Sequence, residues 1–326
     1  MEYRKLIKFG NSSYIVSLPK TWIERHKLRK GDSLHLDVNG NGELMIAPKL
    51  VESTKEKKGI TIDADNKDIF YIKREIVSAY INNYHNIVIT GDDLSEKALG
   101  MREILNELVA LEIMEQTGKR ISAKDFLDMD NISIQNILRK IDMIVRSALY
   151  DIKTLAKQRK KSADIANSRD KDINRLTILA LRTIRYGMNN SAFIKNNKLS
   201  PHELLDLYLC ANFLEQIADE AKRTARILDH IIDEHINEPG ASEFYDQLID
   251  YFIQIEEMYV TAMKSFYKKD RYIAFDLATK RAKLKSSLDN LSHKIVHELK
   301  RSNRVVEKLA SMLNHVHGIT RICYQG

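Results

Sequence analysis

Two carboxylates one helical turn apart are the clearest candidates for a chemical role in this chain. They lie in the apolar-patterned segment LEQIADEA (residues 214–221), as Glu215 and Asp219. Side chains four residues apart on a helix point to the same side, so this pair repels itself unless a cation or a basic side chain lies between. Lys222 and Arg223 follow directly. Cation binding and an ordinary solvated face with basic neighbours are therefore the two alternatives.

Enzymatic chemistry finds little support. The carboxylate pair has no oxyanion-stabilising loop beside it, and no serine or cysteine nucleophile lies in a recognisable turn. Cys210 and Cys323 are the two cysteines, far apart and inside apolar helical patterns. They exclude a disulfide framework or a four-cysteine zinc site, and they indicate a reducing, cytoplasmic setting. Without a recognisable nucleophile or oxyanion-stabilising loop, we expect no enzyme. The sequence shows neither a secretory signal nor an apolar run of membrane-spanning length, so we expect no integral membrane protein.

Positive charge is concentrated at the N-terminus. The chain has a net charge of +7, and residues 1–50 hold nine Lys/Arg against five Asp/Glu. Such an excess favours attraction to nucleic acid or another anionic surface. Turn residues and a hairpin signal divide this segment into four short strands, at residues 3–9, 14–18, 33–38 and 43–47, and one short helix at residues 20–28. These elements bury too little apolar surface for a stable monomer, so we expect a dimer.

The same N-terminal string resembles a known family. KFGNSSYIVSLPKTWIERHKLRKGDSLHLDVNGNGELMIAP (residues 8–48) contains, in order, G-x-S-S, an apolar strand ending in L-P-K, a short helix, L-x-x-G-D and a final hairpin. This order is similar to that of the AbrB/MazE/SpoVT swapped-hairpin family, in which two chains interlace their hairpins into one β-barrel. The resemblance implies a homodimer that binds DNA through Arg4, Lys5, Lys8, Ser12, Ser13 and Lys20. The alternative is a dimer clamp whose basic residues are merely solvated.

A polar linker, residues 48–59, leads to a small unit at residues 60–130. Its pattern predicts strand, helix, strand, helix and a hairpin, at residues 60–64, 68–83, 86–90, 95–109, 111–116 and 120–126. The sequence Gly91-Asp92-Asp93 lacks the glycine spacing and the lysine of a phosphate-binding loop. A structural spacer and a small-ligand fold both remain open for this α/β layer.

From about Ile132 the period is helical. Six long helices fit, at residues 132–160, 162–195, 200–236, 241–268, 270–300 and 302–325. Ser200-Pro201-x-Glu203 is a strong helix start, with N-cap, N1 and N3 residues of the preferred types. The helices form two sets of three around Pro239, with a weak internal repeat that aligns residues 170–174 with 285–289 and 214–217 with 313–316. This predicts a duplicated three-helix bundle.

The acidic helical segment also resembles a family. E-x-x-x-D at Glu215 and Asp219, and DKDIN at residues 170–174, are similar to the signatures of PhoU proteins, which are pairs of three-helix bundles and in several cases carry metal ions. The resemblance covers residues 132–326. It implies a divalent or ferric ion held in the first bundle by Asp170, Asn174, Glu215 and Asp219.

The second repeat departs from that pattern. Lys285, Asn314 and Gly318 stand where acids are expected, and of the acids Asp289 alone is retained. A protonated lysine cannot bind a cation, so we expect no metal in the second bundle. His293 and His297, with His315 and His317, could form a substitute cluster. Because side chains two apart on a helix diverge, we interpret their proximity in the sequence as coincidence.

Together the resemblances describe a multidomain chain. Its expected parts are a swapped-hairpin β-barrel at residues 1–50, a small α/β unit at 60–130, and an all-α, PhoU-like body at 131–326 made of two three-helix repeats (about 132–236 and 241–326). The combination resembles the phosphate-uptake regulators found in archaea. It implies a transcriptional regulator of phosphate uptake whose body senses a partner or ligand. The alternative is an adaptor that dimerises through its N-terminal part and contacts a phosphate ABC transporter ATPase or a sensor kinase.

Overall fold

The computed structural model describes residues 3–38, 42–48, 58–92, 94–297 and 303–325. It divides into two compact units, Met1–Lys57 and Lys58–Gly326, called here the N-terminal unit and the main unit. The predicted boundary near residue 130 lies inside the main unit, which contains both the α/β layer and the helical body. Within the described ranges, none of the helices has the length and apolar content needed to span a bilayer.

The N-terminal unit consists of two separate hairpins joined by a short helix. Strands β1 (Ile7–Phe9) and β2 (Ser13–Ile15) pair antiparallel around a three-residue turn, in which Gly10 adopts a φ of +67°. Helix α1 spans Lys20–Arg25, and strands β3 (Leu34–Val38) and β4 (Leu44–Pro48) form the second hairpin. All five predicted elements are present. The first two strands are shorter than predicted, because only three residue pairs form a ladder.

No described side chain of the N-terminal unit is buried. Leu36 and Val38 project from one face of β3 and lie opposite Ile46 and Leu44 of β4. Leu36, Val38 and Leu44 are 59%, 63% and 56% exposed. A single copy of this segment therefore leaves uncovered the apolar surface that a β-structure normally buries.

The α/β layer contains all the predicted elements in the predicted order. They are β5 (Gly59–Asp63), α2 (Ile69–Ile81), β6 (Asn86–Thr90), α3 (Leu94–Asn106), β7 (Leu111–Gln116) and β8 (Arg120–Asp125). The sheet order is β5-β6-β8-β7, with β5 and β6 parallel and the other pairs antiparallel. Ile72 and Ile76 of α2 pack with Ile87 and Ile89 of β6 in a core of its own.

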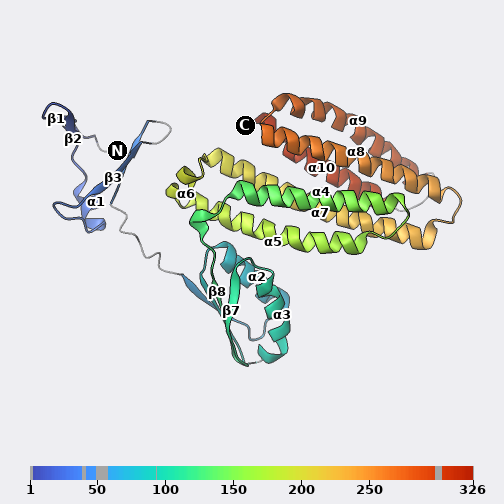
Figure 1. The fold of residues 1–326 in the computed structure, drawn as a ribbon, viewed down its shortest axis with the longest axis horizontal. Helices are drawn as coiled ribbons and strands as arrows, with labels where there is room; N and C mark the ends of the chain where they lie inside the picture. Colours follow the sequence, from blue (N-terminus) through green and yellow to red (C-terminus); the bar gives the residue numbers. More distant parts are fainter. Residues whose placement is uncertain (1–2, 39–41, 49–57, 93, 298–302, 326) are drawn as a thin grey trace. The chain divides into compact units, whose positions relative to one another are not determined.

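The helical body follows a short 3₁₀ turn at Met129–Asn131. Its helices are α4 (Ile134–Lys157), α5 (Ala163–Met188), α6 (Ser191–Asn196), α7 (Pro201–His230), α8 (Ala241–Lys268), α9 (Arg271–His297) and α10 (Arg304–Gln325). The long helices run side by side (Figure 1). Helices α4, α5 and α7 form one bundle, α8, α9 and α10 form the other, and the two meet along α7–α10 and α4–α8. Equivalent helices of the two sets thus pack on each other, which confirms the duplicated three-helix architecture.

The single helix predicted over residues 162–195 is wrong, since it breaks into α5 and α6. Asn190 caps α6 by accepting a hydrogen bond from the Phe193 backbone nitrogen. Phe193 then folds back over Gly187, where an added Cβ would lie 3.0 Å from the Phe193 ring. A glycine for close approach and an asparagine for the cap together allow this turn. The predicted start of α7 is confirmed, with a full capping box between Ser200 and Glu203.

Candidate functional site

The acidic turn predicted from the sequence forms between α5 and α7. Helix α5 carries Asp170 and Asn174, and α7 carries Glu215 and Asp219. The Nζ atom of Lys222 lies 2.7 Å from Asp170 Oδ2 and 2.6 Å from Asp219 Oδ1. A lysine ammonium, largely shielded from solvent, therefore bridges the two aspartates across the helix pair.

Neighbouring groups complete this charge network. Asn174 Nδ2 donates to Asp170 Oδ2 at 3.2 Å, and Arg223 Nη2 donates to Asp219 Oδ2 at 3.0 Å. Burial opposes the charge of Lys222, but its hydrogen bonds to the two aspartates outweigh that effect and raise its pKa. Lys222 therefore stays protonated at neutral pH.

For Glu215, in contrast to Lys222, the surroundings disfavour the charged form. Its partial burial raises the pKa of its carboxyl group, and the charges of Asp219 and Asp170 raise it further, with partial relief from Lys222 and Arg223. The structure thus brings all four predicted ligands to one place, but around an internal ammonium. Because that ammonium holds the position between the aspartates, the donor set does not fit a divalent or ferric ion. The ion itself remains a prediction from the resemblance.

The second bundle carries no matching acidic turn among its described residues. Asn314 accepts a hydrogen bond from Arg281 Nη2 at 2.7 Å, and Lys285 and Asp289 are exposed. Gly318 lies under the Phe213 ring, where an added Cβ would come within 2.4 Å of a ring carbon. The close approach of α7 and α10 therefore explains why a glycine replaces the expected acid.

The histidines singled out in the sequence do not assemble into a cluster within the described part of the chain. His293 is exposed, and the side chain of His297 lies outside the described residues. Ser311 Oγ lies 3.3 Å from His315 Nε2, and burial lowers the pKa of His315. Burial and the charges of Arg281 and Arg321 lower the pKa of His317.

The predicted DNA contacts all lie at the surface of the N-terminal unit. Arg4 and Lys5 precede β1, Lys8 lies within it, Ser12 is in the turn, Ser13 begins β2 and Lys20 begins α1; all six are exposed. They do not share one face. Lys8 pairs with Tyr14, whereas Ser13 pairs with Phe9, and successive residues of a strand point to opposite sides. Lys8 and Ser13 therefore lie on opposite faces of the hairpin.

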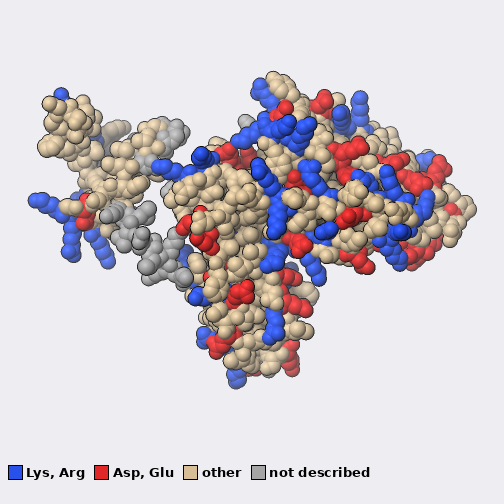
Figure 2. Space-filling model, in the orientation of Figure 1, with Lys and Arg blue, Asp and Glu red and all other residues tan. Residues whose placement is uncertain are grey.

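A denser group of cations surrounds α1. Arg25, Lys27, Arg29 and Lys30 are all exposed and follow Lys20 within ten residues. In Figure 2, Lys and Arg side chains gather around the part of the N-terminal unit that α1 occupies, whereas the β1–β2 hairpin shows little charge. These four residues are not among the contacts predicted from the sequence. The signal that could have found them is the run of cations itself, since Glu24 is the one acid between Lys20 and Lys30.

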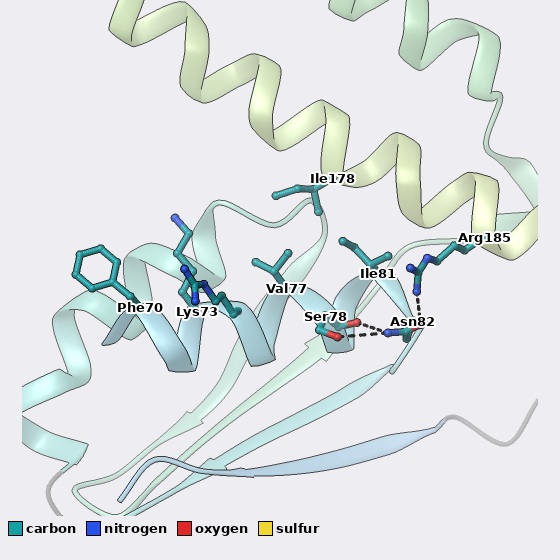
Figure 3. A pocket seen from close by; sticks show the side chains of 9 residues that line it. Phe70, Lys73, Val77, Ser78, Ile81, Asn82, Ile178 and Arg185 are labelled. Carbon is teal, nitrogen blue, oxygen red and sulfur yellow. Dashed lines mark hydrogen bonds between the residues drawn. The ribbon is translucent and has the colours of Figure 1, made fainter. Parts of the chain in front are cut away.

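A groove lies where the α/β layer meets the helical body. It has a volume of about 530 Å³ and is lined by residues of α2, by the Asn82 cap that follows α2, and by residues of α5. The lining residues are Phe70, Lys73, Arg74, Val77, Ser78, Ile81, Asn82, Ile178 and Arg185. Figure 3 shows Phe70, Val77, Ile81 and Ile178 along it, with Lys73 and Arg185 also in the lining. The lining contains three cationic side chains and no carboxylate. Lys73 Nζ is paired with Glu107 Oε2 at 2.6 Å, and Arg185 Nη1 donates to Asn82 Oδ1 at 2.7 Å. The small-ligand alternative for the layer therefore stays a prediction.

Two comparisons with known proteins found a match, each over part of the chain. Residues 7–53 match the family model "Antidote-toxin recognition MazE, bacterial antitoxin". No curated protein matches the sequence. The crystal structure of PhoU from Pseudomonas aeruginosa matches with 14% sequence identity and a TM-score of 0.45, covering 59% of this chain and 90% of that one.

The N-terminal unit is thus MazE/AbrB-like. The matched segment includes Lys8, Ser12, Ser13 and Lys20 and also the cations around α1, whereas Arg4 and Lys5 precede it.

Proposed function

We propose that this protein is a dimeric, DNA-binding regulator of phosphate uptake. It acts in the cytoplasm and catalyses no reaction. The N-terminal unit contacts DNA, and the helical body receives the signal. The observation that carries the proposal is the N-terminal unit itself, which combines uncovered apolar strands with a surplus of exposed cations.

In this proposal a second copy of the chain buries the exposed apolar side chains of these strands. Leu36, Val38 and Leu44 stay largely solvent-exposed in one chain, and among the described residues the two hairpins form separate two-stranded sheets. Strands at the edges of such sheets can pair with another chain. Interlacing with a second N-terminal unit would bury this surface and join the hairpins into one barrel. Such a dimer presents every cation twice, related by a two-fold axis, as two DNA half-sites require.

The positive charge around α1 supplies affinity for phosphate groups of DNA. Residues 20–30 contain five cations, with Glu24 as the one acid among them. Each Lys or Arg that neutralises a DNA phosphate releases counterions, so binding weakens steeply with salt. Ser12 and Ser13 in the first hairpin can fix the register on the DNA backbone.

The link to phosphate uptake rests on the helical body. Its duplicated three-helix architecture and its E-x-x-x-D turn at Glu215 and Asp219 resemble PhoU proteins. In the proposed mechanism, a partner or ligand changes the state of the body, and this alters the geometry of the paired N-terminal units on DNA.

Fluorescence anisotropy of the full-length protein on short duplexes, at several salt concentrations, tests the DNA half. Lys8→Ala and Arg25→Ala should weaken binding to every duplex and each reduce the magnitude of the salt slope by about one. Lys171→Ala, an exposed lysine on α5, is the matched control and should bind like the wild type. Binding without salt dependence, or no binding at all, would refute the DNA half. Genomic fragments selected by the protein should derive from the upstream regions of phosphate-uptake genes.

The positions of Lys8 and Ser13 favour the adaptor alternative. Lys8 and Ser13 lie on opposite faces of the β1–β2 hairpin, so a single DNA surface cannot use both from one copy. If the N-terminal unit only dimerises, Lys8→Ala and Arg25→Ala would leave binding to a phosphate ABC transporter ATPase or a sensor kinase unchanged. Pull-down of those two partners with the same variants separates the two functions.

A further inference from the structure

The end of α7 departs from regular α-helix at a point rich in metal-binding residue types. After His230 the chain continues as a π-helix over Ile231–His235. Residues five apart diverge on an α-helix, but the i→i+5 hydrogen-bond pattern of a π-helix returns them to the same side. The rings of His230 and His235 accordingly meet edge to face, with centroids 5.4 Å apart.

Glu234 completes a group of three potential ligands. The ligand atoms of His230, Glu234 and His235 all lie within 4.8 Å of one another. His230 Nδ1 is 3.4 Å from Glu234 Oε1. Around a tetrahedral zinc ion with bonds of about 2.0–2.2 Å, ligand atoms lie roughly 3.3 Å apart. The side chains are about half exposed, so small rotations can close the group around an ion that enters from solvent.

A fourth residue orients one of the imidazoles. Glu238 Oε1 lies 2.8 Å from His235 Nδ1. An ionised carboxylate can only accept, so Nδ1 donates this hydrogen bond, and in the neutral imidazole Nε2 is then the nitrogen that can bind a metal ion. Carboxylate-to-imidazole hydrogen bonds of this kind fix the tautomer of metal-binding histidines. A set of two imidazoles and one carboxylate favours zinc over magnesium or calcium, which prefer oxygen ligands alone.

We propose that His230, Glu234 and His235 form a binding site for a transition-metal ion of the zinc class, with Glu238 positioning His235. The site is separate from the acidic turn at Glu215 and Asp219, and it does not depend on the proposed DNA-binding function. It lies immediately before the turn at Pro239 and Gly240 that connects the first three-helix bundle to the second. A bound ion would hold the π-helical turn closed and stiffen the connection between the bundles.

Metal titration of untagged, chelator-treated full-length protein tests the proposal. Isothermal titration with Zn²⁺ should show one ion per chain with micromolar or tighter affinity, and Co²⁺ should give the visible absorption of a tetrahedral site. The double variant His230→Ala/His235→Ala should lose at least 100-fold in affinity. Glu238→Gln should lose about tenfold, the lower end of the range for residues that orient a ligand.

Two controls separate this site from other metal-binding groups. His202→Ala removes an exposed histidine at the other end of α7, and Glu215→Gln removes a carboxylate from the acidic turn; both should bind Zn²⁺ like the wild type. Because the ligand side chains lie at the surface, circular dichroism should show that the double variant is folded. Absence of stoichiometric binding in the wild type, or wild-type affinity in the double variant, would overturn the proposal.

Discussion

Arg182 of α5 and Asp125 at the end of β8 form an ion pair from which solvent is fully excluded. Arg182 Nη1 donates to Asp125 Oδ1 at 3.2 Å, and Nη2 donates to Oδ2. Nε donates to Asn83 Oδ1 at 3.0 Å, and the guanidinium lies over the Tyr80 ring, 4.2 Å from its centroid. One side chain of the helical body is thus held by three residues of the α/β layer, which makes the layer a fixed part of the main unit.

Truncating this arginine should be among the most damaging single changes in the main unit. Arg182→Ala leaves the Asp125 carboxylate buried without a partner, and we expect a loss of about 3–5 kcal/mol in the free energy of unfolding, measured with urea. Arg185→Ala, one turn further along α5, removes an arginine that donates to Asn82 at the surface, and it should change stability by about 0.5 kcal/mol or less. The double variant Arg182→Met/Asp125→Asn should lose less than Arg182→Ala, since it leaves no buried charge. Equal losses for Arg182→Ala and Arg185→Ala would contradict this role.

The contrast between Arg182 and Ser200 shows what sequence can predict. Ser200 caps α7 through Glu203, three residues away, so the signal is local and the prediction is confirmed. The hydrogen-bond partners of Arg182 lie 57 and 99 positions away in the chain. Nothing near Arg182 in the sequence distinguishes it from an exposed arginine, because its burial depends on how two separate elements dock.

The apolar face of the second hairpin should control dimerisation. Leu36→Asp places a charge where the proposed partner chain must pack, whereas His35→Asp places the same charge on the opposite face of β3. We expect Leu36→Asp to yield monomers in size-exclusion chromatography with light scattering, and to weaken DNA binding. His35→Asp should remain dimeric. A monomeric wild type, or a dimeric Leu36→Asp variant, would show that this face is not the interface.

Lys222 should act as a built-in counterion for the acidic turn. Lys222→Met leaves Asp170 and Asp219 facing each other, and removal of hydrogen bonds to charged groups should cost about 1.5–3 kcal/mol in urea unfolding. Millimolar Mn²⁺ or Mg²⁺ should restore part of that stability, because the vacated position is then surrounded by oxygen ligands. The wild type and Lys171→Met should show no such cation dependence. A wild type that is stabilised by these ions to the same extent would instead support the metal expected from the resemblance.

The group that neutralises the acidic turn could not be predicted from the sequence. Spacing alone places Glu215 and Asp219 on the same side of α7, and Lys222 is a neighbour on that helix. The hydrogen bond from Lys222 to Asp170 joins residues 52 positions apart. Whether a metal ion or a lysine neutralises the turn is therefore decided by the packing of α5 against α7, which the helical period does not specify.

Glu215 gives the main unit a predictable pH dependence. Burial, followed by the charges of Asp219 and Asp170, raises the pKa of this carboxyl group in the folded protein. The folded state therefore holds the proton more tightly than the unfolded chain, so the contribution of Glu215 is fully present below the unfolded-state pKa of about 4.3 and is lost as the pH rises through the folded-state pKa. Glu215→Gln removes the ionisation while keeping the shape of the side chain. We expect this variant to unfold at higher urea concentration than the wild type at pH 7, with the difference shrinking as the pH falls towards 4. Glu257→Gln, at an exposed position on α8, should show the same dependence of stability on pH as the wild type. If Glu215→Gln were instead less stable than the wild type at pH 7, the ionised carboxylate would stabilise the turn.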